Sequence, residues 1–114
     1  MKDEQHINWA ITEVPKGWHS LFYDMVDALK ATGKDFYILQ AKEKFGGLRV
    51  YLGAYEAFDG PDIFSEIIDS YERAASIICQ ECGSIGMLRE INGWYATLCG
   101  DCAEKRTQST QRDT

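Results

Sequence analysis

The chain has few of the features that mark membrane, secreted or histidine-dependent catalytic proteins. It contains no run of 18 apolar residues, so it predicts no membrane-spanning helix. Its first ten residues, MKDEQHINWA, include no apolar segment of the kind that a secretory signal has. Its only two histidines, His6 and His19, form neither an HExxH motif nor part of a Ser/His/Asp arrangement. We therefore predict a cytoplasmic protein that is not an enzyme.

Basic residues are in the minority. The 12 lysines and arginines are outnumbered by 18 aspartates and glutamates, which gives a formal net charge of −6. A chain that is acidic overall does not attract a phosphate backbone as a whole. A nucleic-acid-binding role would therefore need a local basic patch.

The length of 114 residues fits one small domain. We expect a compact α+β domain over residues 1–103, with the first dozen residues loosely held. Residues 104–114, EKRTQSTQRDT, include no large apolar side chain and are expected to form a flexible polar tail. A domain of this size often needs a disulfide or a metal to stabilise it.

Two segments have the three- and four-residue apolar spacing of amphipathic helices. In residues 14–35 the apolar stripe comprises Trp18, Leu21, Phe22, Met25 and Leu29. In residues 59–78 it comprises Phe64, Ile67, Ile68, Tyr71, Ala74, Ala75 and Ile78, with Asp59 or Gly60 as the expected N-cap. Another side of the second helix carries Asp62, Glu66 and Asp69, a candidate contact surface for a protein partner, although acidic residues near a helix start also stabilise the helix itself.

Between the two helices, residues 35–53 alternate with a period of two and predict a hairpin that turns at Gly46-Gly47. This pairing puts Lys44 opposite Arg49 and Lys42 opposite Tyr51. The apolar face would carry Tyr37, Leu39, Ala41, Phe45, Leu48, Val50 and Leu52.

The basic face of this hairpin is a candidate site for phosphate or for a partner's carboxylates. Like charges that face each other across strands, here Lys44 and Arg49, cost stability unless an anion lies nearby. The alternative is that the acidic second helix neutralises the basic face within the fold.

Four cysteines form two CxxC pairs, Cys79 with Cys82 and Cys99 with Cys102, with 16 residues between the pairs. The spacing is typical of zinc ribbons, in which a hairpin brings two cysteine knuckles to one tetrahedral ion. We predict one structural Zn²⁺ ion held by all four cysteines. A redox CxxC pair and an iron site are the alternatives, but a redox pair usually opens a helix after a strand, whereas Cys79 follows a predicted helix.

The segment between the cysteine pairs predicts a second hairpin, with a type I′ turn at Asn92-Gly93. Pairing Ile91 with Trp94 puts Met87 and Leu98 on the same face as these two. Arg89 is a candidate neighbour of Trp94, and the two side chains could stack a nucleic-acid base. The alternative is that Trp94 packs over the cysteine knuckles as core.

The motifs KEKFGGLRVY and CQECGSIG...NGWYATLCGDC together resemble a group of small bacterial and phage or prophage proteins. Their shared pattern is an N-terminal GW helix, a KEKFG-x-LR hairpin, CxxCG, a later GW and TLC-x2-C, and the match spans about residues 17–103. These proteins are similar to zinc ribbons and are largely of uncharacterised function. The resemblance implies a metal site and a mobile-element setting, and it implies no reaction.

The sequence thus predicts an α+β fold in the order helix, β-hairpin, helix and C-terminal four-cysteine zinc ribbon, with residues 79–103 as an integral subdomain. We predict a non-enzymatic module that binds a cytosolic protein partner, by analogy with small acidic phage proteins that inhibit host or defence machinery. The alternative is a nucleic-acid-binding zinc ribbon that uses Lys42, Lys44, Arg49 and Arg89.

Overall fold

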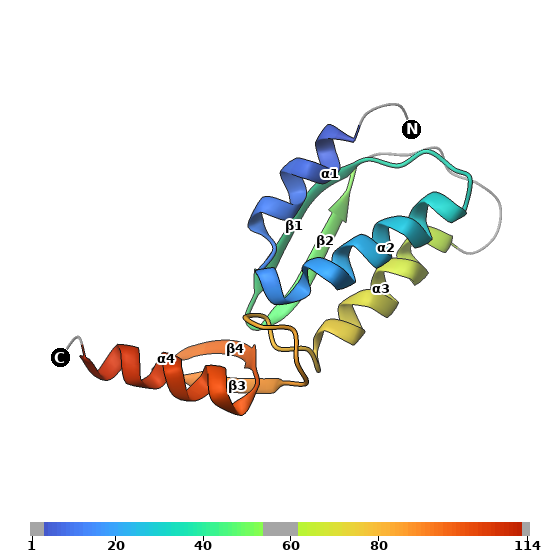
Figure 1. Ribbon diagram of the computed structural model, residues 1–114. Helices are drawn as coiled ribbons and strands as arrows, with labels where there is room; N and C mark the ends of the chain where they lie inside the picture. The colour runs from blue at the N-terminus through green and yellow to red at the C-terminus, as the bar shows by residue number, and fades with distance from the viewer. Residues whose placement is uncertain (1–3, 54–61, 113–114) are drawn as a thin grey trace.

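The computed structural model describes residues 4–53 and 62–112, which form a mixed helix-and-sheet fold (Figure 1). The elements are α1 (Gln5–Ala10), the 3-10 helices η1 (Ile11–Glu13) and η2 (Lys16–Trp18), α2 (His19–Ala31), β1 (Ile38–Lys44), β2 (Gly47–Leu52), α3 (Ile63–Ala75), β3 (Met87–Ile91), β4 (Trp94–Leu98) and α4 (Gly100–Arg112). The predicted order of helix, hairpin, helix and hairpin is present. The structure adds α1 before it and α4 after it.

Both ends of the chain are more ordered in secondary structure than the composition suggested. Near the N-terminus, α1 buries His6, Ile7 and Ala10. At the other end, residues 104–112, expected to be a flexible tail, continue α4. The segment is rich in Glu, Lys, Arg and Gln, which have high helix propensity and can extend a helix that has already begun. Prediction from apolar spacing alone missed this extension.

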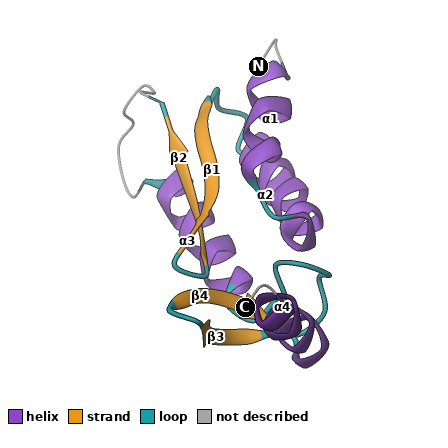
Figure 2. Ribbon diagram, turned by 90° about the vertical axis from the view of Figure 1, so that its left-hand side faces the viewer, coloured by secondary structure: helices purple, strands orange, loops and turns teal. Residues whose placement is uncertain are grey.

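The N-terminal lobe consists of α1, α2, the hairpin β1–β2 and α3. Helices α2 and α3 pack against each other and cover one face of the hairpin (Figure 2). The apolar stripe predicted in residues 14–35 lies on η2 and α2. It faces the core, since Trp18, Phe22, Met25 and Leu29 are all fully inaccessible to solvent. One large cluster of buried side chains therefore joins the helices and the hairpin.

Helix α3 begins at Ile63 because Asp62 caps it. The Asp62 carboxylate accepts hydrogen bonds from the backbone N–H groups of Phe64 and Ser65 at 3.1 and 3.3 Å. This side-chain acceptor satisfies N–H groups that have no partner within the helix. The caps expected from the sequence, Asp59 and Gly60, lie outside the described residues.

The first hairpin turns one residue earlier than predicted. Its turn residues are Phe45 and Gly46, with φ angles of 55° and 82°, so Lys44 pairs with Gly47 and Lys42 pairs with Arg49. The predicted Lys44–Arg49 pair is therefore wrong. Moving the turn by one residue changes each cross-strand pairing by two positions, so each strand keeps the same face toward the core. Ala41, Leu48 and Val50 therefore still lie on the buried face.

An irregularity in β1 corrects the rest of the predicted apolar face. The register shifts between Ile38 and Gln40, so Ile38 is buried while Tyr37 and Leu39 are exposed. Phe45, at the turn, is also exposed. A period of two cannot reveal a bulge, because the extra residue reverses the faces of everything before it.

The C-terminal hairpin β3–β4 has the predicted geometry. Ile91 pairs with Trp94 and Met87 with Leu98, and the type I′ turn at Asn92-Gly93 has φ angles of 53° and 85°. Helix α4 packs on this hairpin (Figure 1). The two lobes together form an elongated molecule of 54 × 26 × 21 Å.

The tip of the first hairpin rests on the C-terminal hairpin. The Thr97 hydroxyl donates a hydrogen bond to the Gly46 carbonyl at 2.6 Å. A Cβ atom on Gly46 would lie 2.5 Å from Leu88 Cδ1 and 3.2 Å from the Ala96 nitrogen, so only glycine fits there without rearrangement.

The Gly17-Trp18 dipeptide makes a second junction between the lobes. The Gly17 N–H donates to the Gln80 carbonyl at 2.9 Å, and Trp18 Nε1 donates to the Ile78 carbonyl at 2.8 Å. A Cβ atom on Gly17 would overlap the Cys79 carbonyl oxygen. The GW and FGG motifs of the sequence are thus the places where the two lobes meet.

Candidate metal centre

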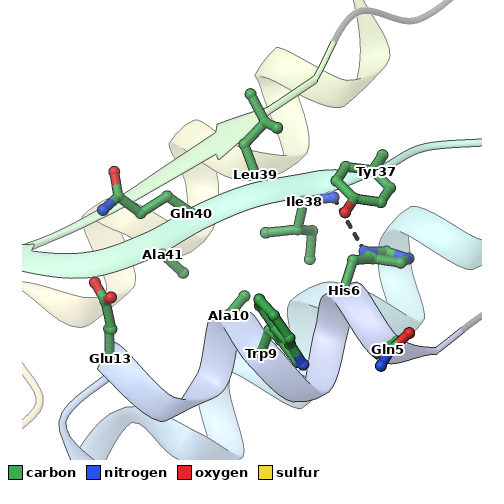
Figure 3. A pocket seen from close by; sticks show the side chains of 10 residues that line it. All are labelled: Gln5, His6, Trp9, Ala10, Glu13, Tyr37, Ile38, Leu39, Gln40 and Ala41. Atoms are coloured by element: carbon green, nitrogen blue, oxygen red, sulfur yellow. Dashed lines mark hydrogen bonds between the residues drawn. The ribbon is translucent and has the colours of Figure 1, made fainter.

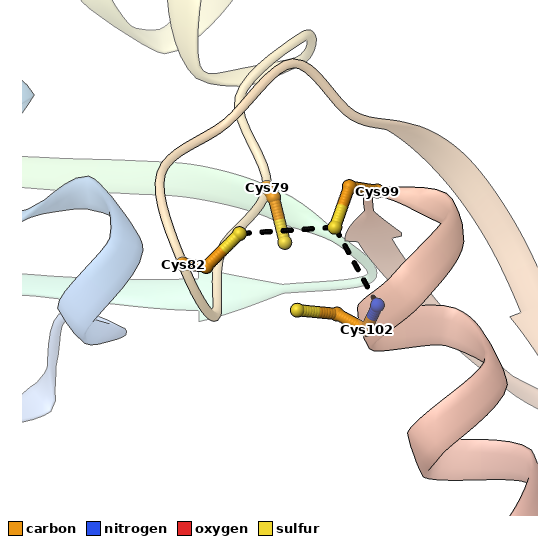
Figure 4. Close-up of side chains that lie close together, drawn as sticks. All are labelled: Cys79, Cys82, Cys99 and Cys102. Atoms are coloured by element: carbon orange, nitrogen blue, oxygen red, sulfur yellow. Dashed lines mark hydrogen bonds between the residues drawn. The ribbon is translucent and has the colours of Figure 1, made fainter.

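The four cysteines come together from two separate segments (Figure 4). Cys79 and Cys82 lie in the loop between α3 and β3, whereas Cys99 and Cys102 lie where β4 passes into α4. Their four Sγ atoms all lie within 4.8 Å of one another. The cluster can therefore hold one metal ion.

The sulfur spacing fits a tetrahedral ion better than a disulfide. The Sγ atoms of Cys82 and Cys99 are 3.7 Å apart. Four sulfurs that each lie about 2.3 Å from one zinc ion would be separated by about 3.8 Å. A disulfide needs a sulfur–sulfur distance of about 2.05 Å, and all four cysteines are free.

Local backbone geometry shapes each knuckle. Gly83 follows Cys82 with a φ of 86°, and its N–H donates to the Cys79 carbonyl at 2.9 Å. Such a left-handed conformation is easy for glycine and strained for other residues. In the second knuckle the Cys102 N–H points at Cys99 Sγ at 3.4 Å.

Hydrogen bonds favour the thiolate form at three of the cysteines. The Ser84 hydroxyl lowers the pKa of Cys82, and the Cys102 N–H lowers the pKa of Cys99. Burial acts to raise the pKa of Cys79, but backbone hydrogen bonds from Cys99, Cys82 and Glu81 leave it lowered.

The fourth cysteine behaves differently. Its hydrogen bond to Cys99 and its burial raise the pKa of Cys102 to about 12. The pKa of this thiol is therefore shifted in the opposite direction from the pKa values of the other three. Clustered thiolates of this kind are ligands for soft or borderline metal ions such as zinc and iron.

The basic residues predicted on the first hairpin do share one face. Lys42, Lys44, Arg49 and Tyr51 alternate along β1 and β2 with the buried residues Ala41, Leu48 and Val50, so they share the face opposite the buried one. Over residues 4–53 and 62–112, none of the three cations forms an ion pair. Among these residues, no ion pair therefore joins the basic face to the acidic helix.

The acidic residues of α3 have separate positions. Asp62 caps the helix, whereas Glu66 and Asp69 are exposed on it. Glu72, which hydrophobic periodicity does not single out, accepts a hydrogen bond from the Val50 N–H at 2.9 Å. This carboxylate satisfies a backbone donor on the outer edge of β2.

Arg89 and Trp94 lie on one face of the C-terminal hairpin, as predicted. Arg89 Nε donates to the Leu98 carbonyl at 2.9 Å. Trp94 is 77% exposed, so the interpretation that it packs as core over the knuckles is wrong. The small residues Ala96 and Ala103, with Leu98, pack beside the cysteines instead.

A groove of about 290 Å³ runs between α1 and β1 (Figure 3). His6 lines it, buried rather than loose, and its Nδ1 accepts a hydrogen bond from the Ile38 N–H at 3.0 Å. Its ring also stacks on Tyr37, with centroids 4.8 Å apart. The described residues that line the groove include no cysteine, serine or lysine, although Glu13 and Tyr37 are among them.

Comparison with known proteins does not assign the chain to a family. No protein-family model, curated protein or solved structure gives a significant match to it. Within the described ranges, no helix combines the length and the apolar character needed to cross a membrane.

Proposed function

We propose that the chain is a non-enzymatic binding module in which Cys79, Cys82, Cys99 and Cys102 hold one structural Zn²⁺ ion. The observation that carries the proposal is the clustering of four Sγ atoms within 4.8 Å. The CxxC spacing and the tetrahedral sulfur separation favour zinc. Four protein ligands would fill the coordination sphere, so such an ion stabilises the fold and offers no position to a reacting water.

Metal analysis of the purified chain tests the zinc centre. We expect one zinc ion per chain in native mass spectrometry, and loss of that ion in the Cys82→Ser variant. The Ser84→Ala variant is the matched control, because it changes the neighbouring hydroxyl and keeps all four sulfurs. Iron in place of zinc, or full zinc occupancy in Cys82→Ser, would contradict the proposal.

The module is proposed to act by contact with a protein partner in the cytoplasm. Support comes from three exposed apolar side chains on or beside one face of the C-terminal hairpin: Ile85 is 84% exposed, Met87 58% and Trp94 77%. Exposed apolar groups of this kind mark interaction sites, and Trp and Met are enriched at the centres of protein interfaces. The exposed carboxylates of Glu66 and Asp69 offer a second contact surface.

The resemblance to phage and prophage proteins supports a more specific partner, a component of host or defence machinery. Affinity capture from a bacterial lysate, with nuclease and at high salt, tests the protein-binding role. We expect a protein that is retained by the wild type and lost in a Met87→Ser/Trp94→Ser double variant. Trp9→Ser is the control, because Trp9 is 72% exposed on α1 in the other lobe. Equal recovery by all three proteins would overturn this role for the hairpin face.

A further inference from the structure

The tip of β1–β2 carries an aromatic ring in a backbone conformation that aromatic residues rarely adopt. Phe45 has a φ of 55° at the first central position of a type I′ turn, where Asn, Asp and Gly fit with least strain. Its ring is 70% exposed, so burial within the chain does not offset the strain. Residues with a strained backbone cluster at functional sites. Most of the Phe45 ring is accessible to a binding partner.

One cation lies beside this ring, and a second lies nearby along β2. The Lys44 ammonium is 5.8 Å from the centroid of the Phe45 ring. The Arg49 guanidinium lies back over Gly47, where Nη1 donates to the Leu48 carbonyl at 3.2 Å. A Cβ atom at position 47 would lie 2.9 Å from the same Nη1, so the glycine leaves the space that the guanidinium occupies.

The outward face of β1–β2 next to the tip also carries cations and an exposed aromatic ring. Lys42 is directly opposite Arg49, and Tyr51, opposite Gln40, is 44% exposed. The one carboxylate in this part of β1, that of Glu43, is turned to the Gly46 N–H and accepts from it at 2.7 Å. Facing cations repel each other, and a bound anion would relieve that repulsion.

We propose that this face, formed by Lys42, Lys44, Phe45, Arg49 and Tyr51, binds single-stranded nucleic acid. Unpaired bases stack on Phe45 and Tyr51, and the three cations contact phosphates. A single strand fits better than a duplex, because a base must be free of its partner to stack on an exposed ring. An acidic peptide would satisfy the cations and leave Phe45 without a role. The surface is distinct from Met87 and Trp94, so this proposal does not depend on the protein-binding one.

Fluorescence anisotropy with a labelled mixed-sequence 20-nucleotide strand, DNA and RNA in separate titrations, tests the proposal on the full metal-loaded chain. Three phosphate contacts to a single strand predict a slope of about −2 in log K against log salt, or about a 20-fold loss between 50 and 200 mM. Arg49→Ala should reduce the slope by about 0.7.

The decisive variant is Phe45→Asn, which keeps the type I′ turn and relieves its strain. We expect it to fold at least as well as the wild type and to bind about fivefold or more weakly, because a stacked base is lost. Phe45→Tyr should retain binding. Tyr23→Ala and Lys105→Ala, an exposed aromatic on α2 and an exposed cation on α4, are the matched controls and should bind as the wild type does.

Three results would overturn the proposal: no binding of either strand at 50 mM salt, unchanged affinity in Phe45→Asn, or tighter binding to the matching duplex. A labelled 20-residue polyglutamate included in the same assay separates the peptide alternative. If that peptide binds as tightly as the strand, and Phe45→Asn does not weaken it, the face recognises acidic chains rather than nucleic acid.

Discussion

The two lobes reach a defined structure by different physical means. Among the described residues, the N-terminal lobe buries sixteen apolar side chains in one cluster, including Trp18, Phe22 and Phe64. The buried cluster around the cysteines has four described members, Cys79, Ala96, Leu98 and Ala103. Four small or medium residues remove too little apolar surface from water to order a hairpin and a helix. Burial can thus account for the first lobe, whereas the second has a small core beside a four-cysteine cluster that can hold a metal ion.

Metal removal should produce the largest difference between the lobes. Zinc binding in small metal-dependent domains contributes about 10–16 kcal/mol at neutral pH, comparable to the whole stability of a small domain. Excess chelator should unfold the C-terminal lobe and leave the N-terminal core folded. Far-UV circular dichroism should lose part of its amplitude on chelation, and a cooperative melt of the remainder should persist. A melt unchanged by chelator would contradict the account.

Truncation of a side chain in the large core should destabilise the N-terminal lobe. Phe22 is completely buried, and Phe22→Ala should lower the free energy of unfolding by about 3–5 kcal/mol, because it leaves a cavity among α2, α3 and the hairpin. Tyr23→Ala, one residue along the same helix and 47% exposed, is the control and should change it by about 0.5 kcal/mol or less. Urea titration measures both. Equal effects from the two variants would argue against a packed core here.

Adding one methyl group at the junction between the lobes should lower the stability of the protein. Gly17→Ala places a Cβ against the carbonyl oxygens of Cys79 and Gln80, and should cost about 1–3 kcal/mol as the lobes move apart. Gly100→Ala is the control, because no atom lies within 4 Å of its added Cβ. Thermal melts should show a lower midpoint for the first variant only. An unchanged melt for Gly17→Ala would mean that the lobes are not held together at this point.

The smallest expected change in stability comes from exchanging the first residues of the two hairpin turns. Both hairpins have type I′ turns, but one places Phe45 and the other Asn92 at the position where φ is near 55°. Phe45→Asn should raise the free energy of unfolding by about 1 kcal/mol, and Asn92→Phe should lower it by a similar amount. Chemical denaturation of the metal-loaded variants measures the pair. A loss of stability in Phe45→Asn would show that the ring has a structural role.

The pattern of the sequence was sufficient where one local rule decides the structure. The type I′ turn at Asn92-Gly93 and the pairing of Ile91 with Trp94 followed from turn chemistry. The Cys79–Cys102 spacing correctly predicted that four sulfurs would meet. The stripe on α2 followed from the helical period.

Sequence reasoning failed where contacts from distant segments override a local preference. Gly46-Gly47 is the easier turn by composition, but the chain turns at Phe45-Gly46, with Gly46 close to Leu88 and Ala96 of the C-terminal hairpin. Periodicity alone leaves two interpretations for Trp94, because it does not indicate whether the side chain is covered. The bulge at residue 39 and the hydrogen bond from the Val50 N–H to Glu72 leave no mark in hydrophobic periodicity.

The most direct test of the contrast between the lobes is hydrogen–deuterium exchange, read by mass spectrometry on the metal-loaded chain before and after chelation. We expect backbone amides of β3, β4 and the cysteine loops to lose their protection without metal, while those of α2 and β1 keep theirs. Equal loss in both lobes, or continued protection of β3 and β4 without metal, would contradict the claim that a metal ion replaces a hydrophobic core in the C-terminal lobe.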